Sequence, residues 1–389
     1  MCERQKVWSE NNKGILIKLA LVLVVLLGVS ALMGCYPAGP KGWAGPVVKD
    51  GLLYQATMGG EVRCLDLAGQ GRDWATPLQR LPERGGLCGF GCAPAGPIAI
   101  YGSVAVPGDR VYVGTYDGQL YALYADTGGV IWQYPLGQEK ALGAIVGGPV
   151  VLPELGLVLV GSSDGNLYAF DAERRGPPLW SFRTEGKIWS TPVVVGDIAY
   201  FGSLDNNVYA LRVSRDAPTL VQVYPAQGAI AGQLLITEDT LYVGCFDRQL
   251  YAFDLETAAV KATFMAESGF WSQPLLHGDT IYIGGLDGKV YALDAEDITR
   301  GEVVVETGGP IRSDPVLANG RVVFASKDGK LYLVDPASHR TGIIALGFPV
   351  LSPLAAAGGL VYAHAENGSL YEVDVARHSW RVLYSLEEK

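Results

Sequence analysis

The chain contains few of the residues from which catalytic, metal and nucleic-acid sites are usually built. It has four histidines in 389 residues, and no metal-ligand spacing relates them: His277, His339, His364 and His378. Charged residues make up 18% of the chain and leave a net charge of −10, whereas nucleic acid or anionic lipid would require a basic excess. We find no phosphate-binding loop and no Ser-His-Asp arrangement supported by position. The sequence therefore predicts no catalytic residue, metal ligand or cofactor, and no nucleic-acid partner.

Long apolar runs are also missing, with one exception near the start of the chain. A basic segment is followed by sixteen uncharged, mostly apolar residues from Leu19 to Gly34. We predict a signal peptide over residues 1–34 with a lipobox at Leu32–Cys35, a lipid on Cys35, and a short tether over residues 35–44. The alternative is an uncleaved signal anchor, although sixteen residues are fewer than the about 20 that a span needs. Both interpretations place the rest of the chain outside the cytoplasm.

Cysteine is scarce, and only one pair is close in sequence. Cys88 and Cys92 flank a Gly-Phe-Gly segment inside a long insertion, residues 79–100, between the first two repeats described below. An oxidising compartment favours a disulfide between them. A free pair or a metal-binding pair is the alternative, but no nearby histidine or carboxylate completes a set of four ligands. Cys64 and Cys245 lie in apolar strand-like runs, so we expect buried thiols.

The most abundant feature of the chain is one short sequence motif, which is repeated eight times. The clearest copy runs from Val111 to Leu123 and consists of two apolar runs joined at Asp117-Gly118. The positions equivalent to Tyr112 recur at intervals close to forty residues after the first insertion: Tyr54, Tyr112, Leu159, Tyr200, Tyr242, Tyr282, Val323 and Tyr362. A period near forty with strand-like content is typical of β-propeller blades.

Each repeat predicts four strands. Asp-Gly suits a tight hairpin, and only Asp247-Arg248 departs from the turn-forming pairs. A proline such as Pro192 marks the start of the strand before the hairpin, and a fourth strand after it often ends in an aromatic residue such as Trp180. We therefore predict an all-β fold over residues 45–385, an eight-bladed propeller of four-stranded antiparallel blades. Each blade should come from consecutive sequence, with essentially no helix beyond the leader.

These repeats resemble the pyrroloquinoline-quinone (PQQ) repeat family. Its blades carry the motif Ala-x-Asp-x-x-Thr-Gly-x-x-x-Trp, in which the tryptophan docks on the next blade. Ala122 to Trp132 matches this motif except that Tyr124 replaces the aspartate. The resemblance covers roughly residues 43 to 385. In length, anchor and blade number the chain is similar to the BamB-like lipoproteins of outer-membrane protein assembly. The resemblance is strong evidence for the fold and weak evidence for any enzymatic activity, because the shared motifs are structural.

The same family includes PQQ-dependent dehydrogenases, which the resemblance offers as an enzymatic alternative. In those enzymes the cofactor lies against a disulfide between adjacent cysteines, beside a calcium ion and a catalytic aspartate. This sequence has no Cys-Cys dipeptide and is shorter than those enzymes. Its repeated aspartates are explained by the hairpins. We therefore expect a protein without catalytic activity.

What remains is a surface for protein partners. Aromatic and arginine residues, which commonly anchor interfaces, occupy corresponding places just before the proline-bearing strand in several repeats: Trp43, Trp189, Phe270, Trp271 and Arg312. The alternative is that these rings only fill gaps between neighbouring blades. The insertion over residues 79–100 is a second candidate surface, because loops of that length are often functional.

The sequence as a whole predicts a monomeric, extracytoplasmic, lipid-anchored propeller that binds proteins of the cell envelope. Tyr36 after the lipidated cysteine permits delivery to an outer membrane. If the source has a single membrane, a role in outer-membrane assembly is excluded. The alternatives are a quinoprotein dehydrogenase and a sensor that binds a solute or polymer in the same compartment.

Overall fold

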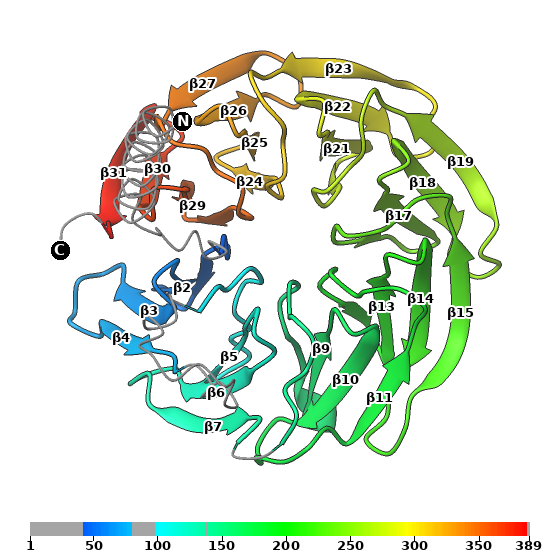
Figure 1. The fold of residues 1–389 in the computed structure, drawn as a ribbon. Helices are drawn as coiled ribbons and strands as arrows, with labels where there is room; N and C mark the ends of the chain where they lie inside the picture. The colour runs from blue at the N-terminus through cyan, green and yellow to red at the C-terminus, as the bar shows by residue number, and fades with distance from the viewer. Residues whose placement is uncertain (1–41, 80–97, 137–138, 387–389) are drawn as a thin grey trace, which may run out of the picture. The chain divides into compact units, whose positions relative to one another are not determined.

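The repeats fold into antiparallel sheets that follow one another around a ring (Figure 1). The computed structural model describes residues 42–79, 98–136 and 139–386. Within these residues there are eight sheets, and each is built from strands that are consecutive in the sequence. The prediction of an eight-bladed propeller is confirmed. We number the blades in chain order.

The first four blades contain the strands β1 to β15. In each four-stranded blade the first strand is innermost and the last is outermost (Figure 1). Blade 1 consists of β1 (Val47–Lys49), β2 (Leu52–Ala56), β3 (Glu61–Asp66) and β4 (Trp74–Pro77). Blade 2 consists of β5 (Arg110–Gly114), β6 (Leu120–Tyr124) and β7 (Val130–Tyr134). Blade 3 consists of β8 (Val150–Leu152), β9 (Leu157–Gly161), β10 (Asn166–Asp171) and β11 (Trp180–Arg183). Blade 4 consists of β12 (Val193–Val195), β13 (Ile198–Gly202), β14 (Asn207–Arg212) and β15 (Thr219–Pro225).

The last four blades contain the strands β16 to β31. Blade 5 consists of β16 (Leu235–Ile236), β17 (Thr240–Gly244), β18 (Gln249–Asp254) and β19 (Val260–Met265). Blade 6 consists of β20 (Leu275–His277), β21 (Thr280–Gly284), β22 (Lys289–Asp294) and β23 (Gly301–Glu306). Blade 7 consists of β24 (Val316–Ala318), β25 (Arg321–Ala325), β26 (Lys330–Val334) and β27 (Thr341–Ala345). Blade 8 consists of β28 (Ala355–Ala357), β29 (Leu360–His364), β30 (Leu370–Asp374) and β31 (Ser379–Tyr384).

Blade 2 has three strands where the sequence predicted four. Its innermost strand is reduced to a single bridge between Ala105 and Tyr112. In blade 1 the equivalent strand pairs over three residues and ends with Lys49 opposite Leu52. Pro107 occupies the place of Lys49 in blade 2, and proline has no N–H to donate to the ladder. The missing strand follows from that proline.

Helix is nearly absent from the described ranges, as predicted. They contain one short 3-10 helix, η1 (Pro153–Leu155), in the turn between β8 and β9. No helix in these ranges has the length and apolar character of a membrane span.

The central hairpins use the turn conformation that the sequence predicted. Gly118, in the Asp-Gly turn of blade 2, has a φ of +80°. Asp247-Arg248 is an unusual sequence for a tight turn, yet it forms one. Arg248 adopts a φ of +77°, a backbone region that costs energy for residues other than glycine. Asp247 Oδ1 accepts the N–H of Gln249 at 3.0 Å, which stabilises this turn. The fold therefore overrides the local preference of the arginine.

The core lies between blades. Eight clusters of buried apolar side chains occur, one for each pair of neighbouring blades, and the pair formed by blades 8 and 1 is included. This explains why the hairpin strands are apolar on both faces: β9, for example, is buried at every residue. Within the described residues the ring closes by packing, and no strand is exchanged between blade 8 and blade 1.

Tryptophans dock consecutive blades in the first half of the ring. The indole N–H of Trp74 donates to the carbonyl of Ala125 at 2.9 Å, and that of Trp180 donates to Ser214 at 2.9 Å. Each acceptor belongs to the next blade, as the family resemblance implied. Trp74 and Trp180 begin their strands, so the expectation that such aromatics end the fourth strand is wrong. From the start of the fourth strand, the indole can reach a backbone carbonyl just after the central hairpin of the next blade.

Candidate functional site at the mouth of the central channel

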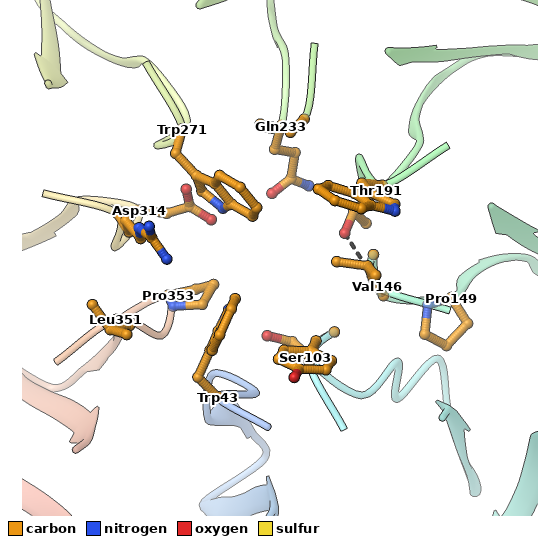
Figure 2. Close-up of a pocket in the computed structure, with 18 of the residues that line it drawn as sticks. Trp43, Ser103, Val146, Pro149, Thr191, Gln233, Trp271, Asp314, Leu351 and Pro353 are labelled. Atoms are coloured by element: carbon orange, nitrogen blue, oxygen red, sulfur yellow. Dashed lines mark hydrogen bonds between the residues drawn. The ribbon is translucent and has the colours of Figure 1, made fainter. Parts of the chain in front are cut away.

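The loops that lead into the innermost strands converge on a cavity of about 180 Å³. All eight blades contribute to it (Figure 2). We call this cavity the channel site. Its lining residues are Trp43, Tyr101, Gly102, Ser103, Val104, Val146, Gly147, Gly148, Pro149, Trp189, Thr191, Ala231, Gly232, Gln233, Trp271, Arg312, Asp314, Leu351 and Pro353.

Four of the five predicted partner residues line the channel site, and the fifth does not. Trp43, Trp189, Trp271 and Arg312 are all partly exposed there. Phe270 is fully buried instead, with its ring centroid 6.0 Å from that of Tyr291. Successive residues of an extended segment point in opposite directions, so Phe270 enters the core when Trp271 faces the channel. The prediction that Phe270 contacts a partner is corrected on this ground.

The tryptophans contact one another across the channel. Trp271 of blade 6 lies with its ring centroid 6.4 Å from that of Trp43 in blade 1 and 6.2 Å from that of Trp189 in blade 4. Its ring is also 5.6 Å from that of Phe246. Blades 1, 4 and 6 are not neighbours in the ring, so these rings do more than fill gaps between adjacent blades. Figure 2 shows Trp43 and Trp271 approaching the cavity from opposite sides.

Trp189 and Trp43 are each fixed by a further contact. The indole N–H of Trp189 donates to the hydroxyl of Ser163 at 3.0 Å, and Lys187 Nζ lies 5.6 Å from the Trp189 ring centroid. Trp43 packs edge-on against Tyr101 with centroids 4.4 Å apart. These contacts hold the aromatic surface in place, and a surface that is already ordered costs less to bind.

Arg312 and Asp314 are the charged residues of the channel site, and they do not pair. The Arg312 guanidinium carbon lies 5.4 Å from the Trp271 ring centroid, a cation–π contact. Its Nε is buried and has no hydrogen-bond partner among the described residues. Asp314 Oδ1 accepts the backbone N–H of Gln273 at 2.7 Å. Burial raises the pKa of Asp314 to about 6, and that hydrogen bond only partly opposes the shift.

The repeated aspartates have structural roles that the sequence analysis only partly anticipated. Asp287 Oδ1 accepts the N–H of Lys289 within its own hairpin, and Oδ2 accepts the hydroxyl of Tyr291 at 2.7 Å. Oδ2 also accepts the N–H groups of Glu267 and Ser268, in the loop that enters blade 6. The Asp–Tyr bond recurs in five consecutive blades, on Asp164, Asp205, Asp247, Asp287 and Asp328. The sequence contains a signal for this bond, because a tyrosine stands four residues after each of these aspartates.

The other predicted sites fall in two groups. Cys64 and Cys245 are buried and free, as predicted, and burial raises the pKa of Cys64 to about 11. Cys35, Cys88 and Cys92 lie outside the described residues, as does most of the insertion. In the described part of the chain no group of three or more histidine, cysteine, aspartate or glutamate side chains is arranged to hold a metal ion.

Comparison with solved structures supports the fold. The chain is similar to BamB from Moraxella catarrhalis, with a TM-score of 0.66 and 19% identity, over 88% of this chain and 94% of that one. It is also similar to the computationally designed Ika8 protein, with a TM-score of 0.62 and 16% identity, over 86% of this chain and 97% of that one. At these identities the likeness extends to the fold and not to the site.

Comparison with curated proteins finds quinoprotein dehydrogenases over part of the chain. A quinoprotein ethanol dehydrogenase of Pseudomonas putida is 30% identical over 170 residues, which cover 41% of this chain and 24% of that protein. A quinohemoprotein alcohol dehydrogenase of Comamonas testosteroni is 33% identical over 139 residues, covering 33% of this chain and 18% of that protein. The matches thus span about a quarter or less of these enzymes.

The family comparison covers more of the chain. The model described as outer membrane protein assembly factor BamB matches residues 59–304 and, in a second overlapping match, residues 266–345. These ranges include the central hairpins from blade 2 to blade 7 and three of the four predicted partner residues that line the channel site. With the fold and the repeats described above, they show that this chain belongs to the PQQ-repeat family of BamB-like β-propellers.

Proposed function

We propose that the protein is a non-enzymatic scaffold of the cell envelope that binds a protein partner at the channel site. The observation that carries the proposal is the preformed aromatic surface of Trp43, Trp189 and Trp271, with Arg312 beside it. Tryptophan and arginine are the residues in which binding energy concentrates at interfaces. The family and the likeness to BamB favour a role in assembling outer-membrane proteins. They also favour a lipid anchor at Cys35.

The test is partner capture by variants of the channel site. Trp271→Ala should weaken capture by about 2 kcal/mol or more, which is typical of an interface hot spot. A tryptophan or phenylalanine whose main role is core packing would instead cost about 3 kcal/mol or more of unfolding free energy when truncated. Because Trp271 is partly exposed and its ring contacts are with Trp43, Trp189 and the half-buried Phe246, we expect a small change in melting temperature.

Trp380→Ala is the matched control. Trp380 is 45% exposed and lies on β31, the outermost strand of blade 8. Its loss should leave capture unchanged. If Trp271→Ala lowers the melting temperature strongly and capture is unchanged, the ring is a packing element and the proposal fails.

The dehydrogenase relatives supply the second candidate function, a PQQ-dependent oxidation. The channel site does not fit that cofactor, because about 180 Å³ is below the roughly 300–1,000 Å³ of small-molecule sites. The chain also lacks the adjacent cysteines that the family resemblance associates with the cofactor. Purified protein supplied with PQQ, calcium and an artificial electron acceptor should show no alcohol-dependent turnover. Turnover under these conditions would replace the scaffold proposal.

A further inference from the structure

The scaffold proposal leaves open which group of the partner Arg312 binds. A buried guanidinium nitrogen without a hydrogen-bond acceptor is costly, and Arg312 Nε is such an atom among the described residues. The side chain is nevertheless held over the Trp271 ring, 5.4 Å from its centroid. A guanidinium offers a planar fork of N–H groups whose geometry matches a carboxylate. No described residue accepts a hydrogen bond from the other guanidinium nitrogens either, and since Arg312 lines the cavity, these N–H groups are available to a ligand.

The size and lining of the cavity restrict that ligand. About 180 Å³ accommodates a side chain or the end of a chain, and it is less than small-molecule sites usually offer. The lining combines apolar side chains such as Trp43 and Trp271 with polar ones such as Gln233. Where the tryptophan rings border Arg312 they exclude water, which strengthens an ion pair there. The ligand that fits is an anionic group on a short apolar stem.

We propose that the channel site binds a carboxylate of the partner polypeptide, with Arg312 as the residue that pairs with it and the channel tryptophans around its stem. This rests on the proposed function, because it specifies which group of the partner enters the cavity. The carboxylate is either that of an aspartate or glutamate side chain or that of the partner's C-terminus. These two sources share the same chemistry and are separated by the probes below.

Asp314 makes the binding depend on pH. It and Arg312 are the charged side chains that line the cavity, and the remaining lining residues are neutral. An ionised Asp314 repels an incoming carboxylate, and a protonated one does not. Since burial raises the pKa of Asp314 to about 6, the affinity for a carboxylate should rise as the pH falls from 7 to 5. Asp314→Asn should raise the affinity at pH 7 and remove this dependence.

The experiment titrates the full-length mature protein with small probes and follows tryptophan fluorescence and NMR shifts. Acetyl-Gly-Leu with a free carboxylate represents a chain end, and acetyl-Glu-methylamide represents an acidic side chain. Acetyl-Gly-Leu-amide is the neutral comparison. One or both carboxylates should bind, and the amide should not. Arg312→Gln should weaken binding about tenfold or more, as expected for a hydrogen-bonded charged pair. Which carboxylate binds identifies the source.

Lys187→Gln is the matched control variant. Lys187 also lies over a tryptophan ring, at 5.6 Å from the Trp189 centroid, but it is exposed and does not line the cavity. It should bind the probes like the unaltered protein. Equal binding of amide and carboxylate, or full binding by Arg312→Gln, would overturn the inference.

The two proposals fail in different ways. If Trp271→Ala abolishes partner capture and Arg312→Gln does not, the channel site is an interface but not a carboxylate site. If neither variant affects capture, the proposed function fails, whatever the probes show.

Discussion

The closure between blade 8 and blade 1 contains a histidine whose replacement should remove one source of instability at acidic pH. Of the eight inter-blade clusters, the one at this closure has the fewest buried members: Leu53, Tyr362 and Leu370. His364 is buried beside it, with Nδ1 3.1 Å from the carbonyl of Ala44 and 3.1 Å from Nε2 of Gln55. Its Nε2 has no partner among the described residues.

The magnitude follows from the pKa of His364. Burial lowers this pKa from 6.5 to about 4, and the contact with the Ala44 carbonyl only partly opposes the shift. Between pH 6.5 and pH 4 the unfolded chain binds a proton that the folded chain does not. The stability present above pH 6.5 is therefore lost as the pH falls through this window. The loss is about 2 kcal/mol at pH 5 and about 3 kcal/mol at pH 4, at about 1.4 kcal/mol per pKa unit.

Asp314 contributes in the opposite direction. Its pKa is raised from 3.8 to about 6, so the folded state binds the proton more tightly and this contribution to stability grows as the pH falls from 6 to 3.8. The two groups partly cancel in the unaltered protein. A comparison with a His364 variant removes the Asp314 contribution, because both proteins share it.

The assay is urea unfolding of the unaltered protein and His364→Gln at a series of pH values. We expect the stability difference between them to shrink by about 2 kcal/mol between pH 7 and pH 5. His339→Gln is the control, since His339 is partly exposed and lies 2.7 Å from Glu302 at the surface. A difference that does not change with pH would refute the assignment of His364 as a buried neutral residue.

Three further predictions concern the anchor, the insertion and the blade scaffold. Cys35→Ser should release the protein from membranes or leave it unprocessed, whereas mass spectrometry of mature protein that retains residues 1–34 would support the uncleaved anchor. Thiol titration of denatured, unreduced protein should find Cys88 and Cys92 blocked by each other and the two buried thiols free; four free thiols would reject the disulfide. Tyr291→Phe removes the hydroxyl that donates to Asp287 at 2.7 Å. Because the acceptor is charged, urea unfolding should show a free energy of unfolding lower by about 1.5–3 kcal/mol. An unchanged value would show that this hydrogen bond does not stabilise the fold.

The blades could be predicted because their signals are local and repeated. The hairpin dipeptides, the prolines before the inner strands and the forty-residue period each specify structure within a single repeat. The loss of the inner strand of blade 2 could also be predicted from the sequence, because Pro107 occupies a position where the sheet needs an N–H donor. The prediction for Phe270 is wrong because adjacent positions do not share a surface in an extended segment. Alternation along an extended segment would have assigned its two rings to opposite sides.

The contacts across the ring could not be predicted from one sequence. His364 and Gln55 meet although 309 positions separate them, and nothing near either residue indicates the other. Trp271 meets Trp43 and Trp189 across the channel, and between Trp189 and Trp271 blade 5 has only the small Ala231 at the equivalent lining position. The unpaired Nε of Arg312 is likewise a property of the packed channel.

The most direct test of the scaffold account is site-specific photo-cross-linking in intact cells. A photoreactive residue in place of Trp271 should cross-link to a protein of the cell envelope, and the same residue in place of Trp380, on the outermost strand of blade 8, should not. Cross-links at the Trp380 position with none at the Trp271 position would contradict a binding site at the mouth of the channel.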